Sequence, residues 1–498
     1  MLFAILMMQE KKKRSIYYVA PLLAIALFPI FWQAGSLPIY LWDEARLAIN
    51  AAEMTGNGNL LVTHFRGEPE MWNTKPPLMI WLQAAFIKML GFTEIAVRMP
   101  SLLAATATCF LIFFICRRLT GSVWSGIFSV FLLITTPGYM KDHVARTGDF
   151  DALLIFFVTS YVVCFFLFLE HEKKKYLYLS ALALTLAVFT KGIAGLLVAP
   201  ALLIYTIYKR KLGYIVGQKE IYISAFFFLV AIGSYYIARE AVNPGYLKAV
   251  MENELGGRYL STLEGHNHPP TFYIDNFLKS KLIPWIFFFP FCVFVLLISG
   301  DKTIRSFTIL ALLFITVLLV IISTAQTKLD WYDAPVFPFI AIVTGLGLYM
   351  ILQSLHYLYS IKRTQMFFCS ALFLLFYFPY AGLLNRYLKE KSESYASRPD
   401  AYYGPAIKET LKKQPELKEM IMFRENGYNG SLEFYMYGYN AEGLIISEAY
   451  PENIDNFVSS QVVITCDANL RKKLTEKYRT SLIYESHACG AFKILGKK

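Results

Sequence analysis

The chain has 498 residues, of which 56% are hydrophobic and only 17% are charged, and its mean hydropathy is +0.44. Soluble domains are about 45–50% apolar and about 25% charged, so this composition excludes an ordinary soluble protein and indicates an integral membrane protein. A net charge of +12 could favour a nucleic-acid partner, but the basic residues fall largely in short clusters between apolar runs, as they do in cytoplasmic loops. We therefore expect no nucleic-acid binding.

The N-terminal segment predicts a membrane anchor. The basic residues 11–14 precede an apolar run over about residues 15–32, and no small-residue cleavage site follows. This pattern is typical of an uncleaved signal anchor whose N-terminus stays in the cytoplasm. Residues 41–77, which come next, should then emerge on the outer face of the membrane.

Residues 41–77 carry the first candidate catalytic groups. Asp43 and Glu44 are adjacent carboxylates where a helical pattern begins. Glu44 could simply stabilise that helix through the helix dipole, whereas Asp43 precedes the helix and could act as a general base. Lys75 stands before two prolines, which hold it on an extended backbone. It could neutralise a lipid phosphate, or contact headgroups in general as a snorkelling lysine does.

The apolar segment 78–90 decides the expected topology. Its length is more typical of an interfacial or re-entrant helix than of the roughly 20 residues that cross a bilayer. If the segment crosses, the basic clusters of the following loops fall outside, whereas they all fall inside if it lies in the interface. The positive-inside rule therefore favours an interfacial helix. The clusters are Arg117-Arg118, 171–175, 209–211 and Lys362-Arg363.

Further apolar runs of membrane-spanning length follow the interfacial segment. They lie near residues 98–116, 122–140, 151–169, 176–190, 193–208, 219–237, 283–299, 304–323, 334–352 and 364–384. With the N-terminal anchor they predict about eleven crossings, each close to the expected length. An odd number places the C-terminus outside, together with the loops 141–151, 239–283 and 324–333 and the turn at Lys191.

The composition becomes polar from about residue 385 and then predicts a small soluble α/β domain. We therefore divide the chain into a transmembrane domain, 1–384, and a C-terminal domain, 385–498. Cys466 and Cys489 could form a disulfide if this domain is exported. We find no catalytic motif there and expect an accessory role. Strands are expected near 420–423, 443–446, 461–466, 481–484 and 491–495, and helices near 403–413 and 468–477.

The second outer loop places Asp149 and Asp151 immediately before an apolar span, with Arg146 close by. Ionisable residues beside the hydrocarbon are costly unless they are solvated or used, so all three are functional candidates. Arg146 could instead simply pair with one of the two acids.

The later outer loops add candidates for phosphate and metal binding. Arg258 could bind phosphate oxygens in a bidentate manner. His266 and His268 could ligate a metal with a carboxylate from elsewhere, although no third protein ligand is identifiable. Lys328 and Tyr332 add a cation and an aromatic side chain to the same face.

Several short motifs follow one another in order along residues 15–350. They are Asp43-Glu44, Lys75-Pro76-Pro77-Leu78, Arg98-Met99-Pro100-Ser101, Asp151-Ala152-Leu153-Leu154, Thr190-Lys191-Gly192 and Lys328-Leu329-Asp330-Trp331-Tyr332. This ordered set resembles the bacterial polyprenyl-phosphate-sugar-dependent glycosyltransferases of the C-type fold. That group includes protein O-mannosyltransferase-like enzymes and the aminoarabinose transferase of lipid A. The resemblance implies a mainly α fold, a polytopic transmembrane helical bundle with interfacial helices, beside the small extracytoplasmic C-terminal α/β domain.

The resemblance also implies roles for individual residues. Asp43 matches the catalytic acid of the first outer loop, which acts as the general base toward the acceptor hydroxyl, and Glu44 is its neighbour. Lys75 matches the lysine that contacts the lipid phosphate. Asp151 matches a second acidic position, with Asp149 beside it.

Positions on the later loops are implied to lie on the phosphate side of the site. Arg258 and Tyr332 resemble such positions, and Lys191 and Lys328 belong to the matching motifs. Aminoarabinose transferases carry a glutamate just before the lysine, associated with a metal site, but this chain has Thr74 there. The expected chemistry therefore needs no cofactor, because cationic side chains can stabilise the departing lipid phosphate. A bound divalent metal is the alternative, with His266 and His268 as its candidate ligands.

The function implied is an inverting membrane glycosyltransferase at the periplasmic face of a bacterial inner membrane. It would move a monosaccharide from a polyprenyl-phosphate donor to a hydroxyl, or a similar group, on a glycolipid, glycan or protein. The alternative is a transporter or flippase of lipid-linked sugars, which should show internal repeats and polar residues near the bilayer midplane. We see no repeat, and the charged residues gather on one face. A structural or assembly protein is a third reading, and it would need neither Asp43 nor Lys75.

Overall fold

The computed structural model describes residues 16–498 except 261, 263–264, 359–361 and 398. The chain forms two compact units. The helical unit combines the described residues up to Trp32 with Glu70–Met79 and Pro100–Leu384. The sheet unit combines Gln33–Pro69, Ile80–Met99 and Asn385–Lys498. The C-terminal residues therefore share a compact unit with two segments from the first hundred residues, and the division into domains 1–384 and 385–498 stays a prediction.

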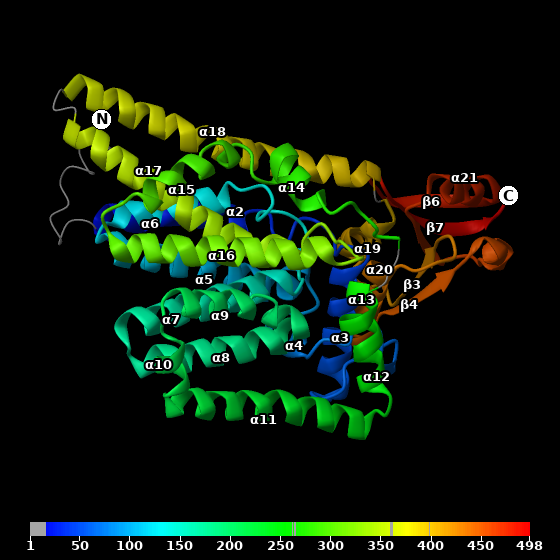
Figure 1. Cartoon of the computed structure of the whole chain (residues 1–498). Coiled ribbons are helices and arrows are strands. Elements are labelled where there is room, and N and C mark those ends of the chain that lie inside the picture. The colour runs from blue at the N-terminus through cyan, green and yellow to red at the C-terminus, as the bar shows by residue number, and fades with distance from the viewer. Residues whose placement is uncertain (1–15, 261, 263–264, 359–361, 398) are drawn as a thin grey trace. The chain divides into compact units, whose positions relative to one another are not determined.

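Long helices dominate the helical unit, and α8, α11 and α16 run in roughly the same direction in Figure 1. The longer helices of the described chain are α2 (Ile16–Phe31), α5 (Glu94–Thr120), α6 (Val123–Ile134), α7 (Asp151–His171), α8 (Lys174–Lys191), α9 (Ala199–Tyr208), α11 (Lys219–Val242), α15 (Phe289–Leu297), α16 (Lys302–Thr324), α17 (Phe337–Leu358) and α18 (Lys362–Ser397). These helices correspond to the predicted apolar runs, which confirms the mainly α, polytopic fold class.

Short helical turns connect the long helices. They are the α-helices α10 (Leu212–Val216), α12 (Tyr246–Val250), α13 (Gly257–Leu260) and α14 (Phe272–Asn276), the π-helices η2 (Met251–Gly256) and η3 (Phe277–Lys281), and the 3₁₀ helices η1 (Gly192–Leu196), η4 (Trp285–Phe287) and η5 (Ala334–Val336). Most of the turns after α11 fall within the predicted outer loop 239–283.

The predicted number of about eleven crossings is not confirmed. Six helices of the described chain are long and apolar enough to cross a membrane, or up to seven if the bent pair Phe272–Lys281 and Trp285–Leu297 is one span. The runs predicted near 15–32, 122–140 and 193–208 contain apolar helices of only 10–17 residues. A turn ends α6 at Ile134 and the 3₁₀ turn 192–196 precedes α9, so these two runs extend further than their helices, whereas α2 fills its run but has only 16 residues. The six long helices still identify a multi-pass membrane protein.

Close helix packing in this unit uses small residues. A Cβ on Gly345 of α17 would lie only 2.1 Å from Ser129 Oγ of α6. The two helices therefore approach so closely that no larger side chain fits at this position. Small residues are typical of helix contacts in membranes, because van der Waals packing rather than hydrophobic burial drives the association there.

The sheet unit holds a mixed five-stranded sheet in the order β4-β3-β5-β7-β6. Its strands β3 and β4 are parallel, as are β3 and β5, whereas β7 is antiparallel to both β5 and β6. Phe423, Val463, Leu470 and Phe492 belong to its buried core. The predicted strands are confirmed as β3 (Glu419–Phe423), β4 (Ile445–Ala449), β5 (Val462–Thr465), β6 (Tyr478–Glu485) and β7 (Gly490–Lys497).

Helices flank this sheet, and Cys466 and Cys489 form a disulfide at the joined ends of β5 and β7. The predicted helices α19 (Tyr403–Lys413) and α21 (Ala468–Lys477) are present, and α20 (Gly430–Ala441) is an additional helix that we did not predict. The 3₁₀ helices η6 (Pro399–Tyr402) and η7 (Pro451–Asn456) complete this part.

The early segments of the sheet unit contain the helix that begins at the predicted acid pair. That helix, α3 (Asp43–Asn57), ends at Gly58, which adopts the left-handed conformation with φ +69° and donates its N–H to Met54 O. Such a C-cap is typical of glycine. The short hairpin β1 (His64–Phe65) and β2 (Glu68–Pro69) follows, and α4 (Leu78–Leu90) forms the helix predicted for residues 78–90. Its interfacial position stays a prediction.

Candidate active site

The carboxylates of the first predicted loop have different environments. Asp43 is the first residue of α3, not a residue before it, and its side chain is exposed. Glu44 is fully buried and accepts hydrogen bonds from Arg98, from Nε at 2.7 Å and from Nη2 at 2.9 Å. It also accepts the N–H of Tyr40 at 2.8 Å. Glu44 thus contributes to the structure through an ion pair, and not only through the helix dipole.

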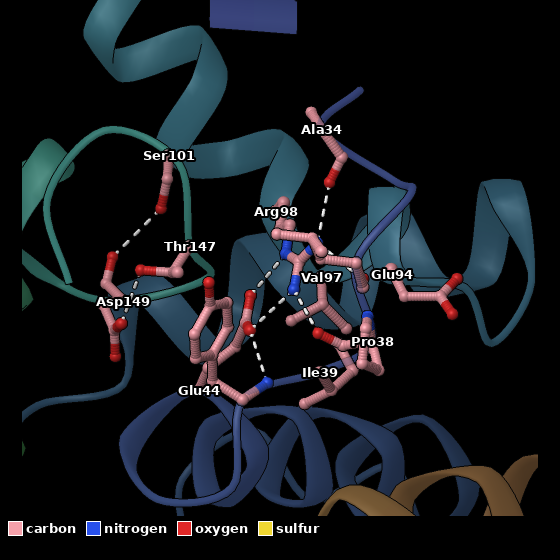
Figure 2. Close-up of polar contacts among 12 residues, drawn as sticks. Ala34, Pro38, Ile39, Glu44, Glu94, Val97, Arg98, Ser101, Thr147 and Asp149 are labelled. Atoms are coloured by element: carbon pink, nitrogen blue, oxygen red, sulfur yellow. Dashed lines mark hydrogen bonds and ion pairs between the residues drawn. The ribbon is translucent and has the colours of Figure 1, made fainter. Parts of the chain in front are cut away.

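Besides pairing with Glu44, Arg98 donates hydrogen bonds to the backbone that precedes α3, as Figure 2 shows. Its Nη1 donates to Ala34 O at 2.8 Å and to Leu37 O at 2.9 Å, while Nη2 donates to Pro38 O at 2.8 Å. A guanidinium has five N–H donors, and these contacts with those to Glu44 use all of them. The chain before α3 is therefore held in one conformation, which fixes where Asp43 begins the helix.

Residues from the C-terminal part of the sheet unit also contact the segments before and after α3. Trp42, directly before Asp43, stacks on Tyr428 with ring centroids 5.1 Å apart. Tyr435 donates from its hydroxyl to Glu94 at 2.7 Å, and Lys408 pairs with the same carboxylate at 2.6 Å. The C-terminal part therefore contacts the residues around the predicted general base.

In the helical unit, Asp151 and Lys191 form a buried ion pair. Lys191 Nζ lies 2.7 and 2.6 Å from the two carboxylate oxygens of Asp151. Asp151 is the first residue of α7, and Lys191 is the last of α8, so two helix ends bring opposite charges together. Lys191 Nζ also lies 5.6 Å from the ring centroid of Tyr332. Three of the predicted site residues therefore lie together.

The loop before Asp151 is ordered by its own polar groups. Asp149 is buried and accepts a hydrogen bond from Thr147 Oγ1 at 2.7 Å, while its backbone carbonyl accepts one from Ser101 at 3.0 Å. His143 Nδ1 lies 3.2 Å from Asp149 Oδ2, and the His143 ring stacks on Trp331 at 3.8 Å. The loops 141–151 and 324–333 are thus in direct contact.

Arg146 ties the same loop to the end of α2. Its Nη1 donates to the carbonyls of Pro29 at 2.7 Å and Trp32 at 2.9 Å. Through these bonds Arg146 holds the loop against the end of α2. The sequence did not predict this contact.

Lys75 has an acidic partner that the sequence did not reveal. Its Nζ lies 2.9 Å from Oε1 of Glu254, on the π-helix η2, and 5.4 Å from the ring centroid of Phe150. Phe150 stands between Asp149 and Asp151. The predicted phosphate-binding lysine therefore lies beside the second acidic loop of the same unit.

The remaining predicted residues lie in the long loops with less specific contacts. Lys328 is buried and donates from Nζ to Ala325 O at 2.6 Å, and its N–H donates to His266 O at 3.0 Å. His268 stacks on Phe272 at 4.2 Å. Within the described ranges, neither histidine belongs to a group of three close metal ligands. The backbone of Arg258 is in α13, but its side chain lies outside the described residues.

A second charged cluster, which the sequence reasoning did not single out, surrounds Lys281. Its Nζ lies 2.7 Å from Asp333 Oδ2 and 3.0 Å from Asp330 Oδ1, and Lys141 also pairs with Asp330 at 2.5 Å. Burial raises the pKa of Asp333 to about 7, although the charge of Lys281 opposes this shift. Burial acts the same way on Asp330, but its hydrogen bonds to Lys141 and Lys281 leave its pKa below the ordinary value. No local spacing indicates this cluster, because Lys281 is 49 residues from Asp330.

Comparisons with known proteins bear on this arrangement. Residues 74–236 match the family described as dolichyl-phosphate-mannose-protein mannosyltransferase. An uncharacterized protein of Aquifex aeolicus is 24% identical over 64% of this chain and 62% of its own length. An undecaprenyl phosphate-alpha-4-amino-4-deoxy-L-arabinose arabinosyl transferase of Shewanella sediminis is 23% identical over 68% of this chain and 61% of its own length. The chain thus spans about three fifths of the length of these relatives.

Solved structures resemble nearly the whole chain. The crystal structure of ArnT from Cupriavidus metallidurans bound to undecaprenyl phosphate has a TM-score of 0.66 and 15% identity, covering 95% of this chain and 97% of that one. The apo oligosaccharyltransferase of Archaeoglobus fulgidus has a TM-score of 0.55 and 13% identity, covering 89% of this chain and 66% of that one. Together with the family and sequence matches, these likenesses show that the chain has the C-type glycosyltransferase fold and is similar to the aminoarabinose transferases.

Proposed function

We propose that this chain is a membrane glycosyltransferase that takes a monosaccharide from a polyprenyl-phosphate donor. The observation that carries the proposal is the position of Lys75 in the helical unit. Its ammonium lies 5.4 Å from the ring of Phe150, next to the acids Asp149 and Asp151. A cation, an apolar ring and carboxylates beside membrane helices suit a ligand that combines a phosphate, a lipid tail and a sugar.

The similarity to known proteins supports the donor class. The relative from Shewanella sediminis is named for an undecaprenyl phosphate-linked aminoarabinose, and the ArnT structure contains undecaprenyl phosphate. A donor of this kind has its lipid tail in the bilayer, so the enzyme needs no soluble nucleotide-binding domain. Lys75 is our candidate for the phosphate, with Arg258, Lys328 and Tyr332 as additional candidates on the later loops.

The proposed reaction is a single displacement at the anomeric carbon. The acceptor hydroxyl oxygen forms a bond to this carbon, the bond between the carbon and the phosphate oxygen breaks, and the polyprenyl phosphate leaves with the electron pair. Asp43 accepts the hydroxyl proton, and the configuration inverts. Lys75 stabilises the charge that develops on the leaving phosphate. Asp151, with Lys191, is our candidate for holding the sugar or the acceptor near the reacting atoms.

We assign Glu44 a positioning role within this proposal. It is buried and its carboxylate oxygens accept three hydrogen bonds, one from the Tyr40 N–H and two from Arg98. A carboxylate in this state holds the start of α3 and does not need to contact a substrate. Asp43, which is exposed one residue earlier, is the better candidate for the proton transfer.

The proposed location is the bacterial inner membrane, with the N-terminus in the cytoplasm and the C-terminal part in the periplasm. The disulfide between Cys466 and Cys489 supports this orientation, because disulfides persist in oxidising compartments. The acceptor is a glycolipid, a glycan or a protein on that side. The aminoarabinose relatives favour a glycolipid similar to lipid A.

The test is complementation of a deletion strain, followed by mass spectrometry of its lipid A, glycans and lipid-linked sugars. The wild-type gene should restore a glycan that is missing from the deletion strain. Asp43→Asn should reduce its formation by about 10²- to 10⁴-fold, the range of general acid–base catalysis. Lys472→Ala, on an exposed face of α21, is the matched control and should restore the glycan fully. If Asp43→Asn also restored it fully, the assignment of the general base would be wrong.

The same experiment separates transfer from transport. A flippase would change the side of the membrane on which a lipid-linked sugar accumulates, without forming a new glycosidic bond. Purified protein in lipid nanodiscs should release polyprenyl phosphate from the donor only when an acceptor is present. Donor translocation without such release would support the transporter alternative.

A further inference from the structure

Lys75, the proposed phosphate ligand, already has an internal counter-ion. The Nζ of Lys75 lies 2.9 Å from Glu254 Oε1, and the two side chains are only 12% and 10% exposed. An ion pair shielded from water in this way is stronger than an exposed one, because the effective dielectric constant around it is lower. Any phosphate that binds Lys75 must therefore compete with this carboxylate.

The segment that carries Glu254 is fixed to the segment that carries Lys75. Asn253 Nδ2 donates to Met71 O at 3.0 Å, and the hydroxyl of Tyr246 donates to Thr74 O at 2.7 Å. Both acceptor carbonyls lie within four residues before Lys75. The ion pair thus joins two segments that also contact each other at two neighbouring points, and Glu254 does not reach Lys75 as a loose surface side chain.

We infer that Glu254 is a displaceable counter-ion which the phosphate of the lipid ligand replaces on Lys75, and which thereby sets how tightly that ligand is held. This inference rests on the proposed function. The phosphodiester of a lipid-linked sugar carries one negative charge, whereas the phosphomonoester left after transfer carries up to about two, since the second pKa of a phosphate is about 6. The nearby carboxylate repels the more charged product more strongly. Glu254 therefore favours release of the polyprenyl phosphate after each turnover.

The chain offers a matched control two residues away. Glu252 is on the same π-helix η2, but its side chain is 64% exposed and lies 3.8 Å from Lys248, which is 79% exposed. Glu252→Gln removes the same charge from the same turn without affecting the partner of Lys75. Glu254→Gln removes the counter-ion and keeps the size and the hydrogen-bonding oxygen of the side chain.

The experiment measures binding of undecaprenyl phosphate to the full-length protein in nanodiscs of zwitterionic lipid. Glu254→Gln should lower Kd by about tenfold, which corresponds to removing one competing charge-assisted hydrogen bond. Glu252→Gln should leave Kd unchanged, and Lys75→Met should abolish binding. In turnover assays, Glu254→Gln should show stronger inhibition by added undecaprenyl phosphate than the wild type. Inorganic phosphate should compete only weakly in every variant, because it lacks the lipid tail.

The outcomes distinguish this inference from the proposed function. If the wild type does not bind undecaprenyl phosphate, the proposed donor class is wrong. If the wild type binds it and Lys75→Met does not, but Glu254→Gln binds with the wild-type Kd or more weakly, then the lysine assignment holds and the counter-ion inference is wrong. Equal tightening by Glu252→Gln and Glu254→Gln would also overturn it, because only the general surface charge would then matter. Lys75→Met and Glu254→Gln each leave one shielded charge without its partner and should lower the unfolding midpoint, so Kd is measured at a temperature well below the midpoint of every variant, which excludes misfolding as the cause.

Discussion

The guanidinium of Arg98 and the carboxylate of Glu44 form a buried ion pair, with Nε 2.7 Å from Oε1. The two residues are 54 positions apart, and both side chains are at most 2% exposed. Arg98 also donates to three backbone carbonyls of the chain that leads to α3. This pair therefore fixes the position at which Asp43 begins its helix.

Breaking this pair should destabilise the protein severely. Arg98→Ala would leave Glu44 buried without its counter-ion, and removal of one partner of a buried pair costs about 3–5 kcal/mol. We expect a much lower unfolding midpoint in detergent and rapid trypsin cleavage. Lys472→Ala should leave the midpoint unchanged, because Lys472 and Glu476 are 3.9 Å apart and largely exposed. An Arg98→Ala protein as stable as the wild type would show that the ion pair contributes nothing to the fold.

The pair of Asp151 and Lys191 should matter to activity beyond its structural role. Asp151→Asn should reduce the transfer rate by about 10²-fold, the scale of losing one positioned polar group in an active site. The exchanged variant Asp151→Lys with Lys191→Asp restores an opposite-charge pair. It should recover the unfolding midpoint and leave transfer activity low. Recovery of both quantities would mean that the pair serves only to hold α7 and α8 together.

The raised pKa of Asp333 predicts that the stability of the protein depends on pH. Burial raises its pKa from the ordinary 3.8 to about 7, so the folded protein holds a proton that the unfolded chain releases between these values. Stability should therefore fall as the pH rises from about 4 to about 7. Asp333→Asn should flatten this part of a plot of the unfolding midpoint against pH. Asp275→Asn is the control, because its carboxylate accepts a hydrogen bond in an exposed setting, and its curve should follow the wild type.

The disulfide between Cys466 and Cys489 should stabilise the C-terminal part. The bond closes a loop of 23 residues. Closing a loop of this size stabilises the folded state by about 3 kcal/mol, because the unfolded chain loses conformational entropy. The double variant Cys466→Ser, Cys489→Ser should become more sensitive to trypsin within residues 399–498. Alkylation followed by mass spectrometry should add two more labels after reduction than before it. The same number of labels in both conditions would show that the thiols are free in the cell.

The pattern of apolar residues determined the helices and strands of this protein. Continuous apolar runs gave the positions of α5, α7, α8, α11 and α16, because a helix in a bilayer must satisfy its own backbone and be apolar along its length. Short apolar segments in the last hundred residues gave the approximate positions of all five strands of the sheet. Ends of helices were harder to predict, as in α6, because the predicted run extended to residue 140 across the turn Thr135-Thr136-Pro137-Gly138, which ends the helix at Ile134.

The ordered motifs of the sequence also identified the type of fold and most of the candidate site. We expected Asp151, Lys191 and Tyr332 in loops on the same face, and the structure brings these side chains together. The motifs could not show which charge pairs with which. Lys75 and Glu254 are 179 residues apart, and Lys281 and Asp333 are 52 apart.

The tertiary structure alone decided what each charged residue does. Glu44 and Asp43 are neighbours in the sequence, yet one is buried against Arg98 and the other is exposed. It likewise placed residues 33–69 and 80–99 in one compact unit with the C-terminal residues. The physical reason is that local patterns record the period of burial along an element. The partner of a charge depends instead on which distant segments come into contact. The low dielectric constant of the interior strengthens the electrostatic interaction between such partners.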